Sequence, residues 1–131
     1  MNFDFTASEV QFFNDLTQAL DLFAAGKDLE SGDGNTAARQ LREALAALAE
    51  TGYLTSGLGR SQTESGGTLC LMAAMEILAA FSPSLFLSIE TSTRLFGRLV
   101  RRWGKDKARA QCLASLEQGQ LLGAVALSER D

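Results

Sequence analysis

The sequence predicts an all-α fold: a small bundle of about five helices that ends in a short strand-like tail. Apolar residues recur at helical spacing through most of the chain, and glycines and one proline interrupt this periodicity where helices are expected to end. Only the last apolar run, Leu121–Leu127, lacks the helical period. With 131 residues, of which 46% are hydrophobic and 21% charged, residues 1–131 have the size and composition of one soluble globular domain.

The first two helices are predicted by capping signals and apolar stripes. Thr6-Ala7-Ser8-Glu9 is a capping box, and Gly26 ends the first helix. Its apolar stripe consists of Val10, Phe13, Leu16, Leu20 and Phe23. A polar loop over residues 29–36 follows, and Asn35 or Thr36 is expected to cap the second helix. This second helix carries Leu41, Leu45 and Leu48, ends at Gly52, and is followed by the hydrophobic latch Tyr53-Leu54.

A Ser-, Thr- and Gly-rich loop over residues 55–67 leads to the third helix. Because residues 69–78 are apolar nearly all round, we expect this helix to be the central, buried one. Ser82-Pro83 predicts a helix stop followed by a restart, with Ser82 as the cap and a fourth helix running to Gly104. A short fifth helix is expected around residues 108–113, before Gly119 breaks the pattern.

The tail Leu121–Leu127 is a short apolar run after a glycine, which favours a strand. A single terminal strand does not stabilise itself. We therefore expect it to pair with a segment outside this chain.

Composition excludes several classes of function. The chain has no histidine, which removes the commonest general base and metal ligand, and its two cysteines have no metal-ligand spacing. Cys70 and Cys112 both fall in apolar helical runs, so we expect buried free thiols, a reducing compartment and a cytoplasmic location. The start of the chain has no signal-peptide pattern. The longest apolar stretch, residues 69–81, is shorter than the ~20 residues that span a bilayer.

The formal net charge of −4 argues against nucleic acid as the main partner. One basic run departs from this average: Arg94, Arg98, Arg101, Arg102, Lys105 and Lys107. Either it is a solvated helix face near a helix C-terminus, or it meets an anionic ligand or partner.

Three segments in order carry a resemblance to a known family. The first is the helix and latch of residues 41–54 together with Glu64-Ser65-Gly66-Gly67. The second is Met75-Glu76-Ile77-Leu78-Ala79 followed by Ser84-Leu85. The third runs from Trp103-Gly104-Lys105 through Leu113 to residues 116–129. Together they resemble the N-terminal helical domain of acyl-CoA dehydrogenases from end to end, with Ala114 and Ile77 where the family has Pro and Glu.

The resemblance implies part of a flavoprotein in which a β-barrel and a C-terminal helical bundle follow the helical domain. Such enzymes remove a proton and a hydride from adjacent carbons of an acyl-CoA thioester, and FAD takes the hydride. The catalytic carboxylate of the family lies in the C-terminal bundle, so no catalytic residue and no metal site are expected in residues 1–131. The chain alone is expected to be inactive.

The resemblance also implies candidate site residues. Val125, Leu127 and Ser128 match the family segment beside the flavin ring, and Ser128 keeps the hydroxyl of the family's threonine. The acyl tail of the substrate would be enclosed by Phe86, Ile89, Glu90 and Thr93. From the residues alone, Glu90 either meets solvent or an arginine at the edge of its apolar stripe, or closes the end of an acyl pocket.

Two alternatives stay open. The first is a flavin monooxygenase of the same fold, and the second is a non-catalytic helical interaction module. In the second, the unpaired apolar tail favours self-association.

Overall fold

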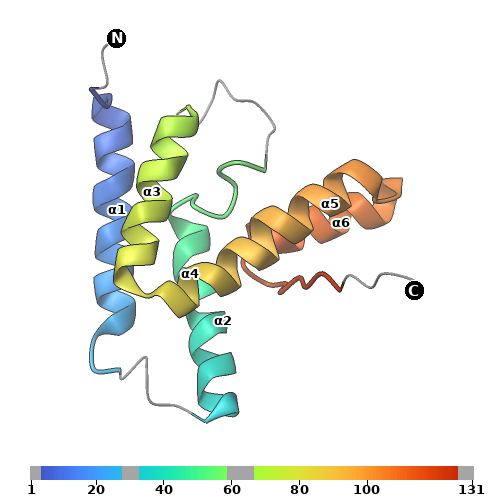
Figure 1. Cartoon of the computed structure of the whole chain (residues 1–131), viewed down its shortest axis with the longest axis horizontal. Coiled ribbons are helices and arrows are strands. Elements are labelled where there is room, and N and C mark those ends of the chain that lie inside the picture. Colours follow the sequence, from blue (N-terminus) through green and yellow to red (C-terminus); the bar gives the residue numbers. More distant parts are fainter. Residues whose placement is uncertain (1–3, 28–32, 59–66, 127–131) are drawn as a thin grey trace, which may run out of the picture.

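The computed structural model describes residues 4–27, 33–58 and 67–126. Its helices are α1 (Ala7–Ala24), α2 (Gly34–Glu50), α3 (Thr68–Phe81), α4 (Pro83–Glu90), the π-helix η1 (Thr91–Phe96), α5 (Gly97–Trp103) and α6 (Asp106–Glu117) (Figure 1). Because α4, η1 and α5 follow one another without a break, the described ranges form five helical rods. The prediction of a small all-helical bundle is confirmed.

The predicted start of α1 is confirmed. Thr6 Oγ1 accepts a hydrogen bond from the Glu9 amide at 3.3 Å, and the Glu9 carboxylate accepts one from the Thr6 amide at 2.8 Å. The hydrogen bond from the Thr6 backbone lowers the pKa of Glu9. Gly26, at φ +73°, lies just beyond the helix end in the left-handed region that glycine tolerates.

The start of α2 differs from the sequence prediction. Asp33 is the N-cap, and its carboxylate accepts a hydrogen bond from the Thr36 amide at 2.8 Å. The cap therefore lies before both expected caps, Asn35 and Thr36. Asp33 wins because a carboxylate at this position also interacts favourably with the helix dipole. After α2, the latch residues Tyr53 and Leu54 are fully buried, as predicted.

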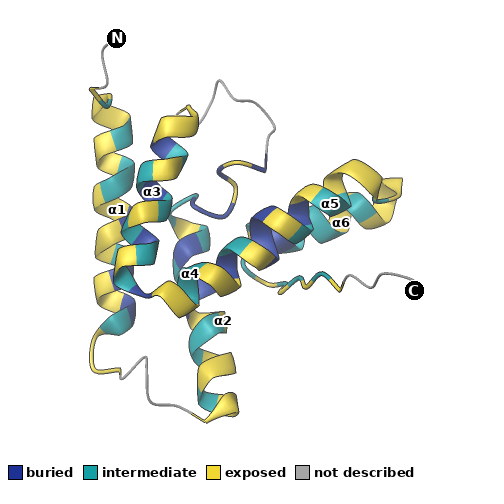
Figure 2. Cartoon of the chain, in the orientation of Figure 1, coloured by how far each residue is buried: buried dark blue, intermediate teal, exposed yellow. Residues whose placement is uncertain are grey.

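The expectation that the third helix would be the central, buried one is wrong, because part of the α3 surface is exposed. This helix packs against α1 and α4, and its buried residues are Cys70, Ala74 and Leu78. On its outer side Leu69 and Met72 are 47% and 61% exposed (Figure 2). An apolar part of the α3 surface thus stays uncovered within the described part of the chain.

The stop and restart at Ser82-Pro83 is confirmed, with the Ser82 hydroxyl accepting the Leu85 amide at 3.3 Å and Pro83 at the first helical position. The rod then continues to Trp103, but its middle six residues form a π-helix. Within this rod the Thr93 hydroxyl donates to the Ile89 carbonyl at 2.7 Å. Such side-chain bonds compete with the helix backbone, and π-helical turns are frequent at functional sites.

The hydrophobic core lies between the first four rods. It is built by buried residues of α1, α2, the latch, α3 and α4: Leu16, Leu20, Leu45, Leu48, Tyr53, Leu54, Ala74, Leu78 and Ile89. The hairpin of α5 and α6 extends away from this core (Figure 1). Both cysteines are free, and Cys70 is buried while Cys112 is half-buried, in agreement with the expectation of unpaired thiols.

The chain leaves α6 through Gly119 and meets η1 at Gly123, whose amide donates to Ser92 Oγ. No strand forms within residues 120–126. Part of the expected strand, Leu127, lies outside the described residues.

Candidate functional site

A buried polar cluster of Tyr53, Glu90 and Arg94 lies where η1 meets the core. The Tyr53 hydroxyl donates to Glu90 Oε1 at 2.7 Å, and Arg94 Nη1 lies 3.0 Å from the same oxygen. The Arg94 guanidinium also lies over the Tyr53 ring, 4.5 Å from its centroid, and donates from Nη2 to the Tyr53 carbonyl at 2.9 Å. One arginine thus binds the carboxylate, the ring and the backbone of its neighbours.

Three elements position this cluster. Glu90 ends α4 and Arg94 lies four residues later in η1, so both project from the same side of the rod. Tyr53 comes from the turn after α2, where Gly52 has a φ of +79° that lets the chain reverse at once. The π-helix begins directly after Glu90 and contains Arg94.

The cluster is closed to solvent. The side chains of Arg94 and Glu90 are 6% and 13% exposed, and Tyr53 is fully buried. Burial is the main cause that raises the pKa of Tyr53, with Glu90 adding to it and Arg94 opposing it, so the phenol stays protonated and donates. Because Glu90 accepts from both partners, it acts as a structural counter-charge and not as a free base.

Two further arginines hold the same turn. Arg98 Nε donates to the Gly57 carbonyl at 3.4 Å, and Arg101 Nη1 donates to the Leu58 carbonyl. With Arg94 they form what we call the arginine clasp: Arg94, Arg98 and Arg101, each bound to a backbone carbonyl of residues 53–58. Sequence reasoning grouped them into one basic run. Their spacing of four and three residues, which places them on one helix face, was the available signal.

The other side of η1 holds the tail. The Gly123 amide donates to Ser92 Oγ at 2.7 Å, and a Cβ at Gly123 would overlap the Phe96 ring. Gly119, at φ +68°, lies against the Leu45 carbonyl of α2. The sequence analysis did not select Ser92 or Gly123, since only the fold brings them together.

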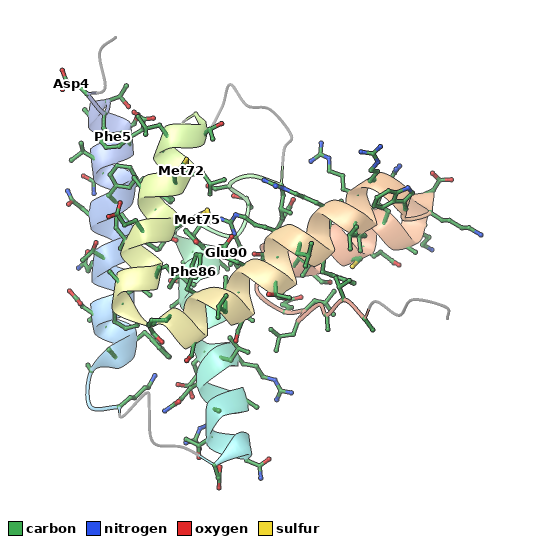
Figure 3. The ribbon with its side chains drawn as sticks, viewed as in Figure 1. Asp4, Phe5, Met72, Met75, Phe86 and Glu90 are labelled. Atoms are coloured by element: carbon green, nitrogen blue, oxygen red, sulfur yellow. The ribbon has the colours of Figure 1, made fainter. Side chains whose placement is uncertain are left out.

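The predicted site residues fall into three groups. Glu90 and Thr93 both contact Arg94, since Arg94 Nη1 donates to Thr93 Oγ1 at 3.0 Å. Phe86 packs half-buried against the core, and Ile89 is a fully buried core member; Figure 3 shows Phe86 and Glu90 on the same rod. Val125 is half-buried in the tail, whereas Leu127 and Ser128 lie outside the described residues.

Two surface hollows lie beside these elements. One, of about 220 Å³, lies between the end of α1 and the starts of α2 and α4, and includes Phe23, Leu41 and Leu85 in its lining. The other, of about 410 Å³, lies between Arg42 on α2 and the tail at Gly119–Leu122. Neither is lined by the four residues predicted to enclose an acyl tail.

Among the described residues, no group of acidic or cysteine side chains is arranged to hold a metal ion. In the same ranges, no helix has the length and apolar character to cross a membrane. Comparisons with protein-family models, with curated proteins and with solved structures find no match. Membership of a family is therefore a proposal that depends on the residues themselves.

Proposed function

We propose that this chain is the N-terminal helical domain of a flavin-dependent acyl-CoA dehydrogenase and contributes one wall of the acyl and flavin site. The observation that carries the proposal is the course of residues 119–126. They leave the helical layer beside η1 instead of continuing α6, and they belong to the segment whose sequence resembles the flavin-side strand of that family.

Exposure along the tail alternates residue by residue. Leu121, Gly123 and Val125 are half-buried, and the residues between and after them, Leu122, Ala124 and Ala126, are exposed. A period of two is what a strand presents to a neighbouring layer. This alternation supports the proposal that the tail pairs with a following sheet, although residues 120–126 form no strand here.

The free backbone N–H groups of the tail determine which of its residues could donate hydrogen bonds to a flavin ring. FAD, when bound, supplies the hydride acceptor of the proposed reaction. The Gly123 amide is taken by Ser92, so backbone donors to a flavin ring would come from the residues after it, of which the structure describes Ala124, Val125 and Ala126. The resemblance implies Val125, Leu127 and Ser128 for this role, and of these three the structure describes Val125.

The acyl wall would be built in two layers. Phe86 is half-buried and would face the substrate, whereas Glu90, held by Tyr53 and Arg94, and the fully buried Ile89 and Thr93 would support this wall from within. The general base and most of the cofactor and CoA contacts would come from the barrel and bundle. Residues 1–131 alone are therefore expected to be inactive.

A flavin titration tests the proposal. We expect FAD absorbance and fluorescence to stay unchanged when chain 1–131 is added, because one wall offers few contacts to the ring. A longer chain that adds the barrel and bundle should purify with bound FAD, and acyl-CoA added without oxygen should bleach the flavin. Stoichiometric FAD binding by residues 1–131 alone would contradict the proposal.

A pair of variants makes the test specific to the tail. In the longer chain, Gly123→Ala should lower FAD retention because the added Cβ displaces the tail from Phe96. Gly34→Ala is the matched control, since nothing lies within 4 Å of its Cβ position. Flavin that acyl-CoA does not bleach, but that reacts with oxygen once reduced, would favour the monooxygenase alternative.

A further inference from the structure

The charge of the chain is segregated. Residues 98–109 contain six Lys and Arg and one acidic residue, a net charge of +5. The other residues contain the remaining six basic and fifteen acidic ones, a net charge of −9, and the two values sum to −4. An acidic protein thus carries half of its cations on twelve residues, which run from the start of α5 to the first turn of α6.

The end of this hairpin combines cations with an exposed aromatic ring. Trp103 ends α5 with 67% of its surface exposed, and the Arg102 guanidinium lies 5.1 Å from its ring centroid. Lys105 and Lys107 follow and are both exposed (Figure 2). We call these four residues the basic tip: Arg102, Trp103, Lys105 and Lys107.

The clasp and the tip have separate roles. Arg94, Arg98 and Arg101 bind carbonyls of residues 53–58 and so explain one part of the basic run as structural. That explanation does not extend to the tip, which lies at the far end of the hairpin from the core (Figure 1). Apart from the Arg102 guanidinium, the largely exposed Trp103 ring is left to solvent among side chains that are mostly cationic.

We propose that the basic tip docks end-on against a membrane surface that contains anionic phospholipids. Cations near such a surface are attracted to its negative potential, and tryptophan prefers the headgroup region, where its ring is partly desolvated. This inference goes beyond the proposed enzymatic function and does not depend on it.

The shape of the hairpin favours a flat anionic surface over a nucleic acid. The twelve residues of α6 span roughly 18 Å at 1.5 Å per residue, which is more than the Debye length of roughly 8 Å at physiological ionic strength. End-on docking therefore keeps the acidic body outside the range of repulsion. A nucleic acid strand that extends past the tip would approach that body.

The single tryptophan supplies the probe, because Trp103 is the only one in the chain. We expect its emission to shift to the blue, and the protein to co-sediment, with vesicles in which roughly a third of the phosphatidylcholine is replaced by phosphatidylserine. Pure phosphatidylcholine vesicles should give neither effect, and added salt should weaken both.

Charge-reversal variants with the same net charge separate the tip from the overall charge. Lys105→Glu/Lys107→Glu should lower vesicle partitioning by at least about tenfold. Arg39→Glu/Arg42→Glu on α2 also changes the net charge from −4 to −8, but should partition almost like the unchanged protein. Trp103→Ala, followed by co-sedimentation, should also weaken binding, and circular dichroism checks that each variant is folded.

Three results would overturn the proposal. The first is no emission shift with anionic vesicles, and the second is an equal loss of partitioning in both double variants. The third is a change of Trp103 emission with a single-stranded oligonucleotide but not with vesicles, which would assign the tip to nucleic acid instead.

Discussion

Arg94 makes three interactions through one side chain and so joins its own rod to the turn after α2. It neutralises Glu90, covers the Tyr53 ring and binds the Tyr53 carbonyl, and all of this occurs out of contact with solvent. A buried ion pair of this kind contributes little net stability compared with apolar residues of the same shape, but removing one member leaves the other buried and uncompensated. The cluster therefore fixes which face of the rod meets the turn.

We predict that Arg94→Ala lowers the free energy of unfolding by about 3 kcal/mol, because Glu90 loses its counter-charge in a desolvated position. Urea unfolding followed by circular dichroism measures the change. The matched control is Arg39→Ala, which breaks another i,i+4 pair, to Glu43, whose arginine is 72% exposed. That control should change the free energy of unfolding by less than about 1 kcal/mol, and equal losses in the two variants would contradict the role given to burial.

Tyr53 gives a prediction for alkaline pH. Burial raises its pKa above the ordinary value of 10.0, so the folded chain keeps a phenolic proton that the unfolded chain loses. The contribution of Tyr53 to the free energy of unfolding is therefore full below pH 10.0 and declines as pH rises above it. As this is the only tyrosine, its ultraviolet absorbance should show phenolate only as the protein unfolds.

The Tyr53→Phe variant isolates this effect from the titration of lysines. Its free energy of unfolding should fall less steeply above pH 10.0 than that of the unchanged protein. Phenolate formation at the ordinary pKa in a chain that circular dichroism shows to be folded would contradict the prediction.

At the scale of elements, two glycines set the course of the tail. Gly119→Ala would place a Cβ 2.5 Å from the Leu45 carbonyl oxygen at a φ of +68°, and we expect it to cost about 2 kcal/mol of unfolding free energy.

Gly123→Ala would displace residues 120–126 from Phe96 and make them more sensitive to limited proteolysis. Gly34→Ala should change neither the unfolding free energy nor the proteolysis of the tail. If the tail of Gly123→Ala resists proteolysis as well as that of the unchanged protein, the close packing of Gly123 against Phe96 is contradicted.

The sequence predicted the elements whose signals are local. The capping box at Thr6 and the restart at Ser82 were found because a cap and its partner lie within three residues. The cap of α2 was misplaced to Asn35 or Thr36 because several adjacent polar residues can serve, and it is the Asp33 carboxylate that accepts the Thr36 amide. Helix ends can therefore be predicted from the sequence to within a few residues, but the sequence does not show which of several neighbouring polar residues is the cap.

The candidate site was less readable because long-range contacts define it. Tyr53 meets Glu90 across 37 residues of sequence, and Gly123 meets Ser92 across 31. The apolar pattern of α3 also gave no sign that one side would stay uncovered, since periodicity reports composition and not the number of packing partners. The resemblance selected Glu90, but the sequence left open whether it meets solvent or an arginine or closes an acyl pocket. In the structure Glu90 is paired with Arg94.

At the scale of the whole molecule, the α5–α6 hairpin is joined to the body differently from the other rods. The core cluster takes its members from residues 16–89. The hairpin adds one buried apolar side chain, Leu116, and this side chain lies outside that cluster. The arginine clasp and the approach of Gly119 to Leu45 make much of the connection. Regions with few buried apolar contacts open at lower free energy than the core.

We therefore predict that amides of α6 exchange with solvent through openings of lower free energy than amides in the middle of α2 and α4. Native-state hydrogen exchange in low urea, read by mass spectrometry, measures this difference. Arg98→Ala/Arg101→Ala should widen it, because it removes two of the three clasp bonds while leaving the core intact. Equal protection in all helices, unchanged in the double variant, would mean that the hairpin unfolds with the body as one cooperative unit and that the clasp adds nothing to their connection.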